Sequence, residues 1–486
     1  MERMQEGCRA LMQPTQWRGG LERPVFSGEG AQLSLQLASL AYSLDVDAWR
    51  REGWTDVSYH VDNALLTGED ANGGSGGRLP GLMSEYKQFM ARLKARSTNL
   101  IGQVLGTVRQ KEQSDTCKAV VMIKKQEDGR YLVAIGFMGT GKRLYDWIAN
   151  FRFSDEEGLH QGCLQLTRHF EESLKEIVFQ KTAAELGMER LTLEDILLEC
   201  TRKDSRFKLW LAGHSQGAAV MQVFAYRAIR QGVLRQNLIG YGFASPSVLY
   251  GEAKMDVRSI PLFHLLNGDD LVCRLGARVH MGTCFVAVPA EEMRSACYGN
   301  VWQDPSFRQV FALVQRVRGN QDALLFLLSL IRAFSALDDT ETVKAVSAML
   351  ARILPERISS ALGGRMENGL RFLRRYVERT YYATTGRRYL PKGTIRVLAA
   401  RMEALIARTG PKVFLRYLLQ SMSIPHRMRN KAAYGNAVPA YAYMAERAPE
   451  GLQNAITSYH PPAGKAARQA LRQKRKKVWG RFGRRI

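Results

Sequence analysis

The sequence predicts an α/β fold in which a mainly parallel β-sheet carries helices on both faces. Strand-like apolar runs alternate with helix-like segments between residues 118 and 288, as expected when crossover helices join parallel strands. One strand-like run, at 207–214, leads straight into a helix-like run that begins at residue 216. Residues 305–425 consist mainly of amphipathic helical segments, so we expect a helical region in addition to the sheet.

The first half of the chain is expected to start with an irregular segment at 1–30. A helix is expected at 31–50, where apolar side chains recur at helical spacing. The Gly-rich run at 67–80 predicts a loop, and residues 84–106 predict a second helix. Strands are then expected at 118–123, 131–137, 207–214, 238–243, 260–266 and 283–288, with a helix near 161–179.

Charge divides the chain near residue 300. Residues 301–486 carry 34 Lys and Arg against 11 Asp and Glu, a net charge of +23, whereas residues 1–300 carry 36 against 35. The polar faces of the helices expected in this basic half are rich in Arg. These helices are expected at 307–317, 322–334, 367–382 and 394–407. The half ends in a cationic tail, residues 465–486, with aromatic side chains interleaved.

Several classes of protein are disfavoured by composition. The N-terminus has no apolar segment of the kind found in a Sec signal peptide, and the longest apolar run, 323–331, is too short to span a bilayer. Seven cysteines without C-x-x-C pairs argue for reduced thiols, synthesis inside the cell and no structural zinc. We expect a cytoplasmic or peripheral-membrane location, or export by a route that needs no Sec signal.

The most informative motif is Gly213-His214-Ser215-Gln216-Gly217, a G-x-S-x-G pentapeptide between an expected strand and an expected helix. That context is typical of a nucleophile elbow, in which a serine occupies a strained turn and its hydroxyl is presented for reaction. Side chains two positions before and after the serine would clash with the neighbouring backbone, which favours glycine at both places. An ordinary Gly-rich turn is the alternative interpretation.

Further motifs surround the elbow in a consistent order. They are YLVAIGFMGTGKRLYDWIANF (131–151), LHQGCL (159–164), LIGYGFASPSV (238–248), LLNGDDLVCRL (265–275) and RVHMG (278–282). In this order the sequence resembles the class 3 (fungal-type) lipase family over roughly residues 30 to 290, about half of the chain. The resemblance implies an α/β-hydrolase-like fold and an ester hydrolase activity.

Four residues depart from the family pattern. Met138 stands where the family usually has Arg, Cys163 where it has Phe, Ala218 where it has Gly, and Cys273 where it has Pro. These differences suggest a distant branch. With the charge distribution, the resemblance divides the chain into a class 3 lipase-like core (1–300), a basic helical insertion or cap (301–425), a return to the core (426–464) and the cationic tail (465–486).

The resemblance also implies which residues carry the chemistry. Ser215 would be the nucleophile, and Asp270 lies where the family places the acid that orients the base. Asp269 is the alternative acid. We expect one of the two aspartates to orient the base and the other to cap a turn.

Three histidines follow Asp270 and are the candidates for the base. His426 fits if residues 300–425 are an insertion between the acid and the base, and we favour it. His280 matches a non-catalytic strand of the family, and it and His460 stay open as alternatives.

The oxyanion hole would combine the backbone N–H of Gln216, which follows the nucleophile, with that of Thr140, and Gly139 would let this backbone approach the substrate. Residues 141–158 stand where the family carries a lid, although a core-packing helix is an equal alternative. His160 matches a structural motif of the family. The reaction requires no cofactor and no metal.

The sequence therefore predicts a serine hydrolase of the lipase or phospholipase A1 type that acts on a lipid or other acyl ester. The basic half suits an anionic membrane surface as a partner. The alternative is a protein that uses this half to bind anionic surfaces or nucleic acid on a non-catalytic hydrolase scaffold. No nucleic-acid motif is present, which disfavours nucleic acid as a partner, and the sequence predicts no oligomeric state.

Overall fold

The computed structural model describes most of residues 2–58, residues 119–139, 158–250 and 255–336, most of 374–428, and residues 440–446 and 456–457. The expected loop at 67–80, the expected helix at 84–106 and the cationic tail at 465–486 lie outside the described residues.

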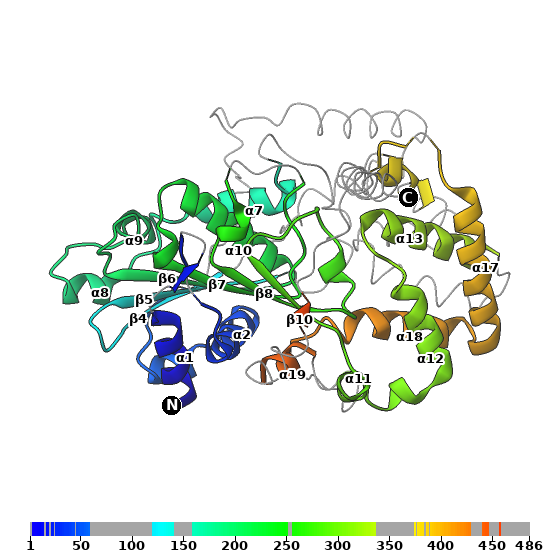
Figure 1. Ribbon diagram of the computed structural model, residues 1–486, viewed down its shortest axis with the longest axis horizontal. Coiled ribbons are helices and arrows are strands. Elements are labelled where there is room, and N and C mark those ends of the chain that lie inside the picture. Colours follow the sequence, from blue (N-terminus) through cyan, green and yellow to red (C-terminus); the bar gives the residue numbers. More distant parts are fainter. Residues whose placement is uncertain are drawn as a thin grey trace, which may run out of the picture.

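An eight-stranded sheet in the order β10-β9-β8-β7-β6-β5-β4-β3 forms the centre of the fold (Figure 1). Its strands are β3 (Thr55–Ser58), β4 (Ala119–Lys125), β5 (Tyr131–Phe137), β6 (Phe207–His214), β7 (Leu238–Phe243), β8 (Leu262–Asn267), β9 (Thr283–Ala287) and β10 (Ile456–Thr457). The strands from β5 to β9 are parallel, whereas β3, β4 and β10 pair antiparallel. The predicted mainly parallel sheet is confirmed.

Helices cover both faces of this sheet. The helices among the described residues are α1 (Glu2–Met12), α2 (Gly28–Ser43), α3 (Asp47–Arg51), α7 (Gln161–Glu172), α8 (Gln180–Glu185), α9 (Leu193–Glu199), α10 (Gln216–Arg230), α11 (Glu291–Tyr298), α12 (Pro305–Val314), α13 (Asn320–Ser335), α17 (Lys392–Thr409), α18 (Pro411–Ser423) and α19 (Ala440–Glu446). Helices α1 and α2 lie on one face, and α7, α9 and α10 lie on the other (Figure 1). Within the described residues, no helix has both the length and the apolar character needed to cross a bilayer.

The strands β5 to β8 are buried at every position because both of their faces are covered, and most of their side chains are apolar. On β5, Leu132 and Ala134 point into the core shared with α2, whereas Tyr131, Val133 and Ile135 point into the core shared with α10. The period-2 alternation of side chains thus builds two hydrophobic layers from one strand.

The N-terminal segment was expected to be irregular, and that prediction is wrong. Residues 2–12 form α1, and a short hairpin follows, made of β1 (Gln16–Arg18) and β2 (Leu21–Arg23). Helix α1 buries Cys8 and Leu11 at helical spacing against α2. The expected helix at 31–50 is interrupted as well, because α2 ends at Ser43 and α3 begins at Asp47.

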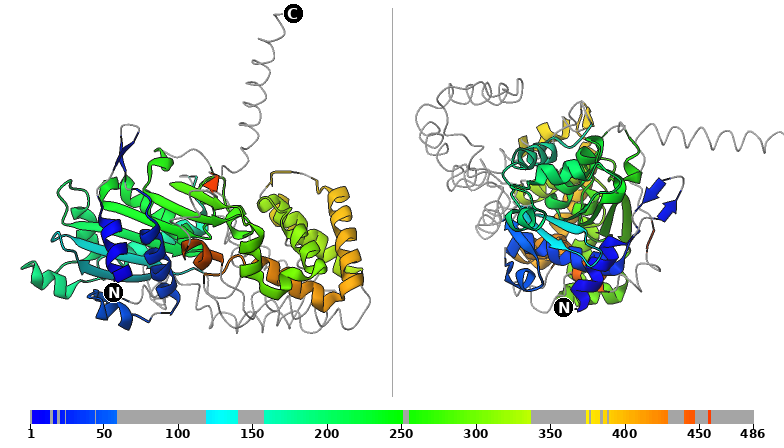
Figure 2. Two further views of the ribbon diagram at one scale, coloured as in Figure 1. Left: turned by 60° about the horizontal axis from the view of Figure 1, so that its bottom comes forward. Right: turned by 90° about the vertical axis from the view of Figure 1, so that its left-hand side faces the viewer.

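Helices α12, α13, α17 and α18 pack on one another on the side of the sheet where β9 and β10 lie (Figure 2). Three of the expected helices correspond to α12, α13 and α17, and the expected helix at 367–382 lies partly outside the described residues. Helices α18 and α19 were not specifically expected. The rings of Tyr298, Trp302, Phe307 and Phe311 pack on one another, with centroids about 5 to 6 Å apart. The change in charge near residue 300 therefore falls within a continuous hydrophobic core.

Two histidines, His264 of β8 and His280 just before β9, are buried in the neutral form. The Nε2 of His280 donates to the carbonyl oxygen of Ser245 at 2.8 Å, and that of His264 donates to the carbonyl oxygen of Met281 at 2.7 Å. The Nδ1 atoms of both rings are buried and have no hydrogen-bond partner among the described residues. Burial lowers the pKa of His280 to about 4 and that of His264 to about 3.

We expect the free energy of unfolding to fall as the pH drops from about 6.5 towards 4. In this range the unfolded chain binds protons at the ordinary histidine pKa of about 6.5, while the folded rings stay neutral. Each buried neutral histidine therefore lowers the free energy of unfolding by about 1.4 kcal/mol for each unit by which the pH falls in this range. Urea unfolding at pH 7.5 and 5.0 measures the loss. His280→Gln should make it smaller by about 1 to 2 kcal/mol. If His280→Gln lost as much stability between pH 7.5 and 5.0 as the wild type does, His280 would not be buried in the neutral form.

Candidate active site

Ser215 occupies the sharp turn between β6 and α10. Its backbone has φ 58° and ψ −126°, a conformation that a residue other than glycine adopts only under strain. The surroundings hold it there: a Cβ atom on Gly217 would lie 2.2 Å from the carbonyl oxygen of Phe137, and one on Gly213 would lie 2.6 Å from the amide of Ala218. The turn therefore has the geometry of a nucleophile elbow.

The structure brings Ser215, His426 and Asp270 into one hydrogen-bonded series. The Nε2 of His426 lies 3.0 Å from the Oγ of Ser215, and its Nδ1 lies 2.9 Å from the Oδ2 of Asp270. Because an ionised carboxylate only accepts, Nδ1 carries the proton and Nε2 is left to accept from the serine hydroxyl. The three residues come from separate parts of the chain, and this arrangement can activate a serine for attack on a carbonyl carbon.

His426 is held by the short segment 424–426, here called the base loop, which directly follows α18. Ile424 is buried in the core. The carbonyl oxygen of Pro425 accepts from Asn267 Nδ2 at 3.4 Å, and the carbonyl oxygen of His426 accepts from His214 Nε2 at 2.7 Å. The base loop is thus attached to the carboxyl ends of β8 and β6.

Asp270 is fully buried and highly hydrogen-bonded. Its Oδ1 accepts from the amide of Val272 at 2.9 Å, and its Oδ2 also accepts from the hydroxyl of Tyr441 at 2.8 Å. Burial alone raises the pKa of Asp270, but His426 and the hydrogen bonds from His426, Tyr441 and Val272 outweigh burial and lower it. The carboxylate therefore stays ionised and accepts from the Nδ1 of His426.

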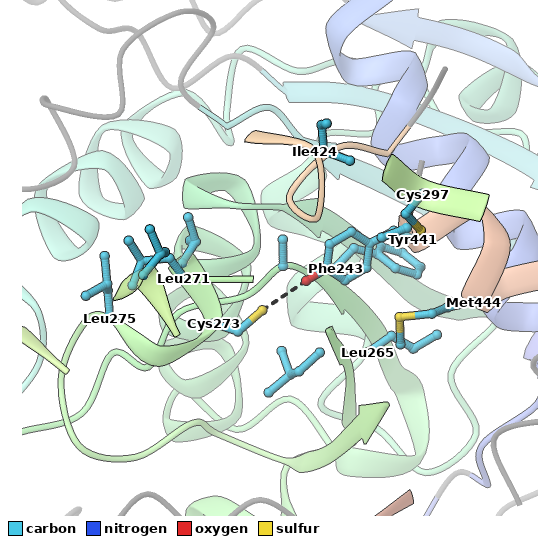
Figure 3. Close-up of a cluster of buried hydrophobic side chains, with 14 of the residues drawn as sticks. Phe243, Leu265, Leu271, Cys273, Leu275, Cys297, Ile424, Tyr441 and Met444 are labelled. Carbon is cyan, nitrogen blue, oxygen red and sulfur yellow. Dashed lines mark hydrogen bonds between the residues drawn. The ribbon is translucent and has the colours of Figure 1, made fainter. Parts of the chain in front are cut away.

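Tyr441 of α19 is the site residue that sequence reasoning missed. Its hydroxyl accepts from the amide of Asn267 at 3.2 Å while it donates to Asp270. The Sγ of Cys273 lies 2.9 Å from the same hydroxyl, and Figure 3 shows this contact among buried apolar side chains. The only available signal was an aromatic residue after His426, and nothing in the sequence singles out Tyr441 among its aromatic neighbours.

The neighbouring Asp269 has a different partner. Arg294 of α11 donates to both of its carboxylate oxygens, at 2.9 and 3.0 Å. The guanidinium of Arg294 also lies over the ring of Trp302, at 5.5 Å from its centroid. Asp269 thus connects the end of β8 to the C-terminal helices, whereas Asp270 contacts the candidate base.

The other predicted site residues lie apart from this series or outside the description. His280 bonds to Ser245, and no described hydrogen bond joins it to Ser215 or Asp270. His160 caps α7, where its Nδ1 accepts from the amide of Cys163 at 3.3 Å. His460, Thr140 and all but the last residue of the expected lid at 141–158 lie outside the described residues.

Gln216 is the first residue of α10, directly after Ser215. The N-terminal amides of a helix point away from its hydrogen-bonded body, and the helix dipole there favours negative charge. The backbone of Gln216 is therefore suitably placed to donate to an oxygen that becomes negative beside Ser215.

Residues 134–280 match the family model described as lipase (class 3). The resemblance to the class 3 lipases is confirmed over this segment. No curated protein sequence matches the chain significantly.

Several solved lipase structures are similar to parts of this chain at low identity. A triacylglycerol lipase, whose catalytic centre is a serine protease triad, is 19% identical, with a TM-score of 0.26, over 36% of this chain and 62% of the lipase. The Rhizomucor miehei lipase in its propeptide complex is 14% identical, with a TM-score of 0.31, over 57% of this chain and 76% of that chain. Lipase II from Rhizopus niveus is 16% identical, with a TM-score of 0.25, over 36% and 63%. This chain thus spans less than two thirds of the length of the first and third of these lipases.

We expect Gly217→Ala to destabilise the fold by about 2 kcal/mol or more, because the new Cβ would force α10 away from the end of β5. Urea unfolding measures the change. The matched control is Gly393→Ala in α17, where a Cβ would meet nothing within 4 Å. This control should leave stability unchanged or raise it by up to about 1 kcal/mol. Equal effects of the two substitutions would contradict the close packing of the elbow.

Proposed function

We propose that this protein is a serine ester hydrolase of the lipase type, which cleaves acyl esters of lipids through an acyl-enzyme intermediate. The observation that carries the proposal is the series Asp270–His426–Ser215, with its serine on a strained strand–turn–helix elbow. The elbow also lies within the segment that matches the class 3 lipases, which supports the same conclusion.

In the proposed reaction, His426 acts first as a base and then as an acid. Its Nε2 removes the proton from the Oγ of Ser215 as Oγ bonds to the ester carbonyl carbon. The resulting imidazolium gives that proton to the departing alcohol oxygen, which leaves the acyl group on Ser215. A water molecule then loses a proton to His426 and attacks the acyl carbon, which releases the fatty acid and restores the hydroxyl. Asp270 favours the imidazolium in both steps.

The tetrahedral intermediates of both steps carry a negative oxygen. The amide of Gln216 at the start of α10 is the proposed first donor, and the backbone of Thr140 is the proposed second. Gly139, the residue before Thr140, lies against the elbow, since a Cβ placed on it would be 3.3 Å from the Gln216 amide. That closeness supports a second donor next to the first. Removal of one such donor typically costs about 3 kcal/mol.

The substrate class that we propose is an ester lipid at a negatively charged surface, cleaved in the manner of a phospholipase A1. The formal net charge of +24 supports this, because basic residues near an anionic membrane contribute about 1 kcal/mol each. The same charge would also suit nucleic acid, which is the alternative partner for a hydrolase scaffold without activity.

We expect wild-type protein to react with a fluorophosphonate probe and to hydrolyse esters, and Ser215→Ala to lose both properties. The activity loss should be about 10³-fold or more. A fluorogenic ester and a panel of anionic, zwitterionic and neutral lipids measure it. Ser329→Ala, which truncates a buried serine of α13, is the matched control and should stay active. A wild type that ignores the probe would favour the non-catalytic scaffold.

Two matched pairs separate catalytic from structural roles. Asp270→Asn and His426→Ala should each lower kcat by about 10³-fold or more, because the base loses its orientation or is absent. Asp269→Asn and His280→Ala should instead lower the free energy of unfolding by about 1 to 3 kcal/mol, with kcat within a few fold of wild type. Initial rates and urea unfolding on all four variants test this. A reversed pattern within either pair would show that its acid or base is wrongly assigned.

A further inference from the structure

Tyr42, near the end of α2, contacts both the elbow and the residue that follows the end of β5 by two positions. The hydroxyl of Tyr42 lies 3.2 Å from the Nδ1 of His214, and it accepts a hydrogen bond from the amide of Gly139 at 3.1 Å. Helix α2 is fixed to β6 by a hydrogen bond from Trp210 Nε1 to Ser34 Oγ at 2.7 Å. The tyrosine therefore has a defined position relative to the elbow.

The direction of each hydrogen bond follows from the chemistry of the partners. The carbonyl oxygen of His426 can only accept, so the Nε2 of His214 at 2.7 Å carries a proton and donates. Burial, reinforced by the nearby His426, lowers the pKa of His214 to about 3, so the ring is neutral and its Nδ1 is an acceptor. Tyr42 therefore donates to Nδ1 at 3.2 Å, with the carbonyl oxygen of His214 as a longer second acceptor at 3.5 Å, and it accepts from Gly139.

The result is a chain of hydrogen bonds that runs from the Gly139 amide to the Tyr42 hydroxyl, to the His214 ring and to the His426 carbonyl oxygen. It joins the end of β5, the elbow strand and the base loop. The rings of His214 and His426 are also close, with centroids 4.7 Å apart. None of these contacts involves the ring nitrogens of His426 that face Ser215 and Asp270.

Gly139 is packed tightly at the start of this chain. A Cβ placed on it would lie 2.5 Å from both the Tyr42 hydroxyl and the carbonyl oxygen of His214. A hydroxyl that holds the Gly139 amide therefore fixes the backbone that packs against the elbow beside the Gln216 amide.

We propose that Tyr42 and His214 are positioning residues: the Tyr42 hydroxyl holds the Gly139 backbone beside the elbow and holds His214 in the tautomer that fixes the base loop. This inference rests on the proposed ester hydrolase function. It assigns a role to His214, the first variable residue of the G-x-S-x-G motif. It also links the Gly139 backbone to the base loop through the hydroxyl of Tyr42.

The first test is Tyr42→Phe, which removes the hydroxyl and keeps the ring that packs against His214. We expect kcat to fall about tenfold with KM within about twofold, because the reacting groups are misplaced while substrate contacts remain. The matched control is Tyr241→Phe. The Tyr241 hydroxyl is also buried and accepts a backbone amide, that of Ser27, beside the other end of α2. The control should keep the wild-type kcat.

The second test separates the hydrogen bond between Tyr42 and His214 from the one between Tyr42 and Gly139. His214→Ala should lower kcat about 100-fold, and His214→Gln, whose side-chain N–H can still donate to the His426 carbonyl oxygen, should recover part of that loss. In the His214→Ala background, Tyr42→Phe should have a smaller effect than in wild type, because only the Gly139 link remains to be broken. Equal effects in both backgrounds would overturn the coupling.

A readout without substrate distinguishes failure of this inference from failure of the proposed function. In protein with ¹⁵N-labelled histidine, the His214 nitrogens should report an Nε2–H tautomer, and Tyr42→Phe should shift the Nδ1 resonance. If this shift occurs but wild-type protein has no esterase activity, the proposed function fails and the hydrogen-bond chain stands. A wild-type kcat in Tyr42→Phe, an equal loss of kcat in Tyr241→Phe, or an unchanged Nδ1 resonance would overturn the inference.

Discussion

The packing of the elbow against its two neighbouring strands is the constraint on which the rest of the site depends. Ser215 keeps a strained backbone because its amide donates to the carbonyl oxygen of Phe243 in β7, at 2.9 Å, while Gly217 lies directly against the end of β5. Parallel pairing of β5, β6 and β7 sets both contacts. A strained backbone of this kind persists only where the surrounding structure holds it in place. Here the pairing of β5, β6 and β7 holds Ser215.

Two adjacent aspartates just after β8, Asp269 and Asp270, have partners of different kinds. Asp270 lies among neutral donors and faces His426, so its charge remains available to the base. The charge of Asp269 is matched by Arg294, which packs over Trp302. The C-terminal helical half therefore does more than carry positive charge, because it supplies the candidate base His426 and packs behind Asp269 and Arg294.

The sheet was largely predictable because its strands are covered on both faces and read as continuous apolar runs. The exceptions are the two edge strands and the N-terminal helix. Strand β3 and the two-residue β10 are too short to show a pattern, and β10 joins the sheet from a position far along the chain. Helix α1 was missed because Cys8 and Leu11 form only a short apolar stripe, whose stability comes from packing on α2.

The sequence by itself determined the local features: the elbow around Ser215, the strand–helix alternation and two adjacent acids after β8. These depend on residue types at short spacing, which backbone geometry restricts directly. Only the tertiary structure decided which distant groups meet. It brought His426 to Ser215 across more than 200 residues, gave Asp270 rather than Asp269 to that histidine, and added Tyr441. Such contacts depend on how helices pack on the sheet, and no local pattern encodes that packing.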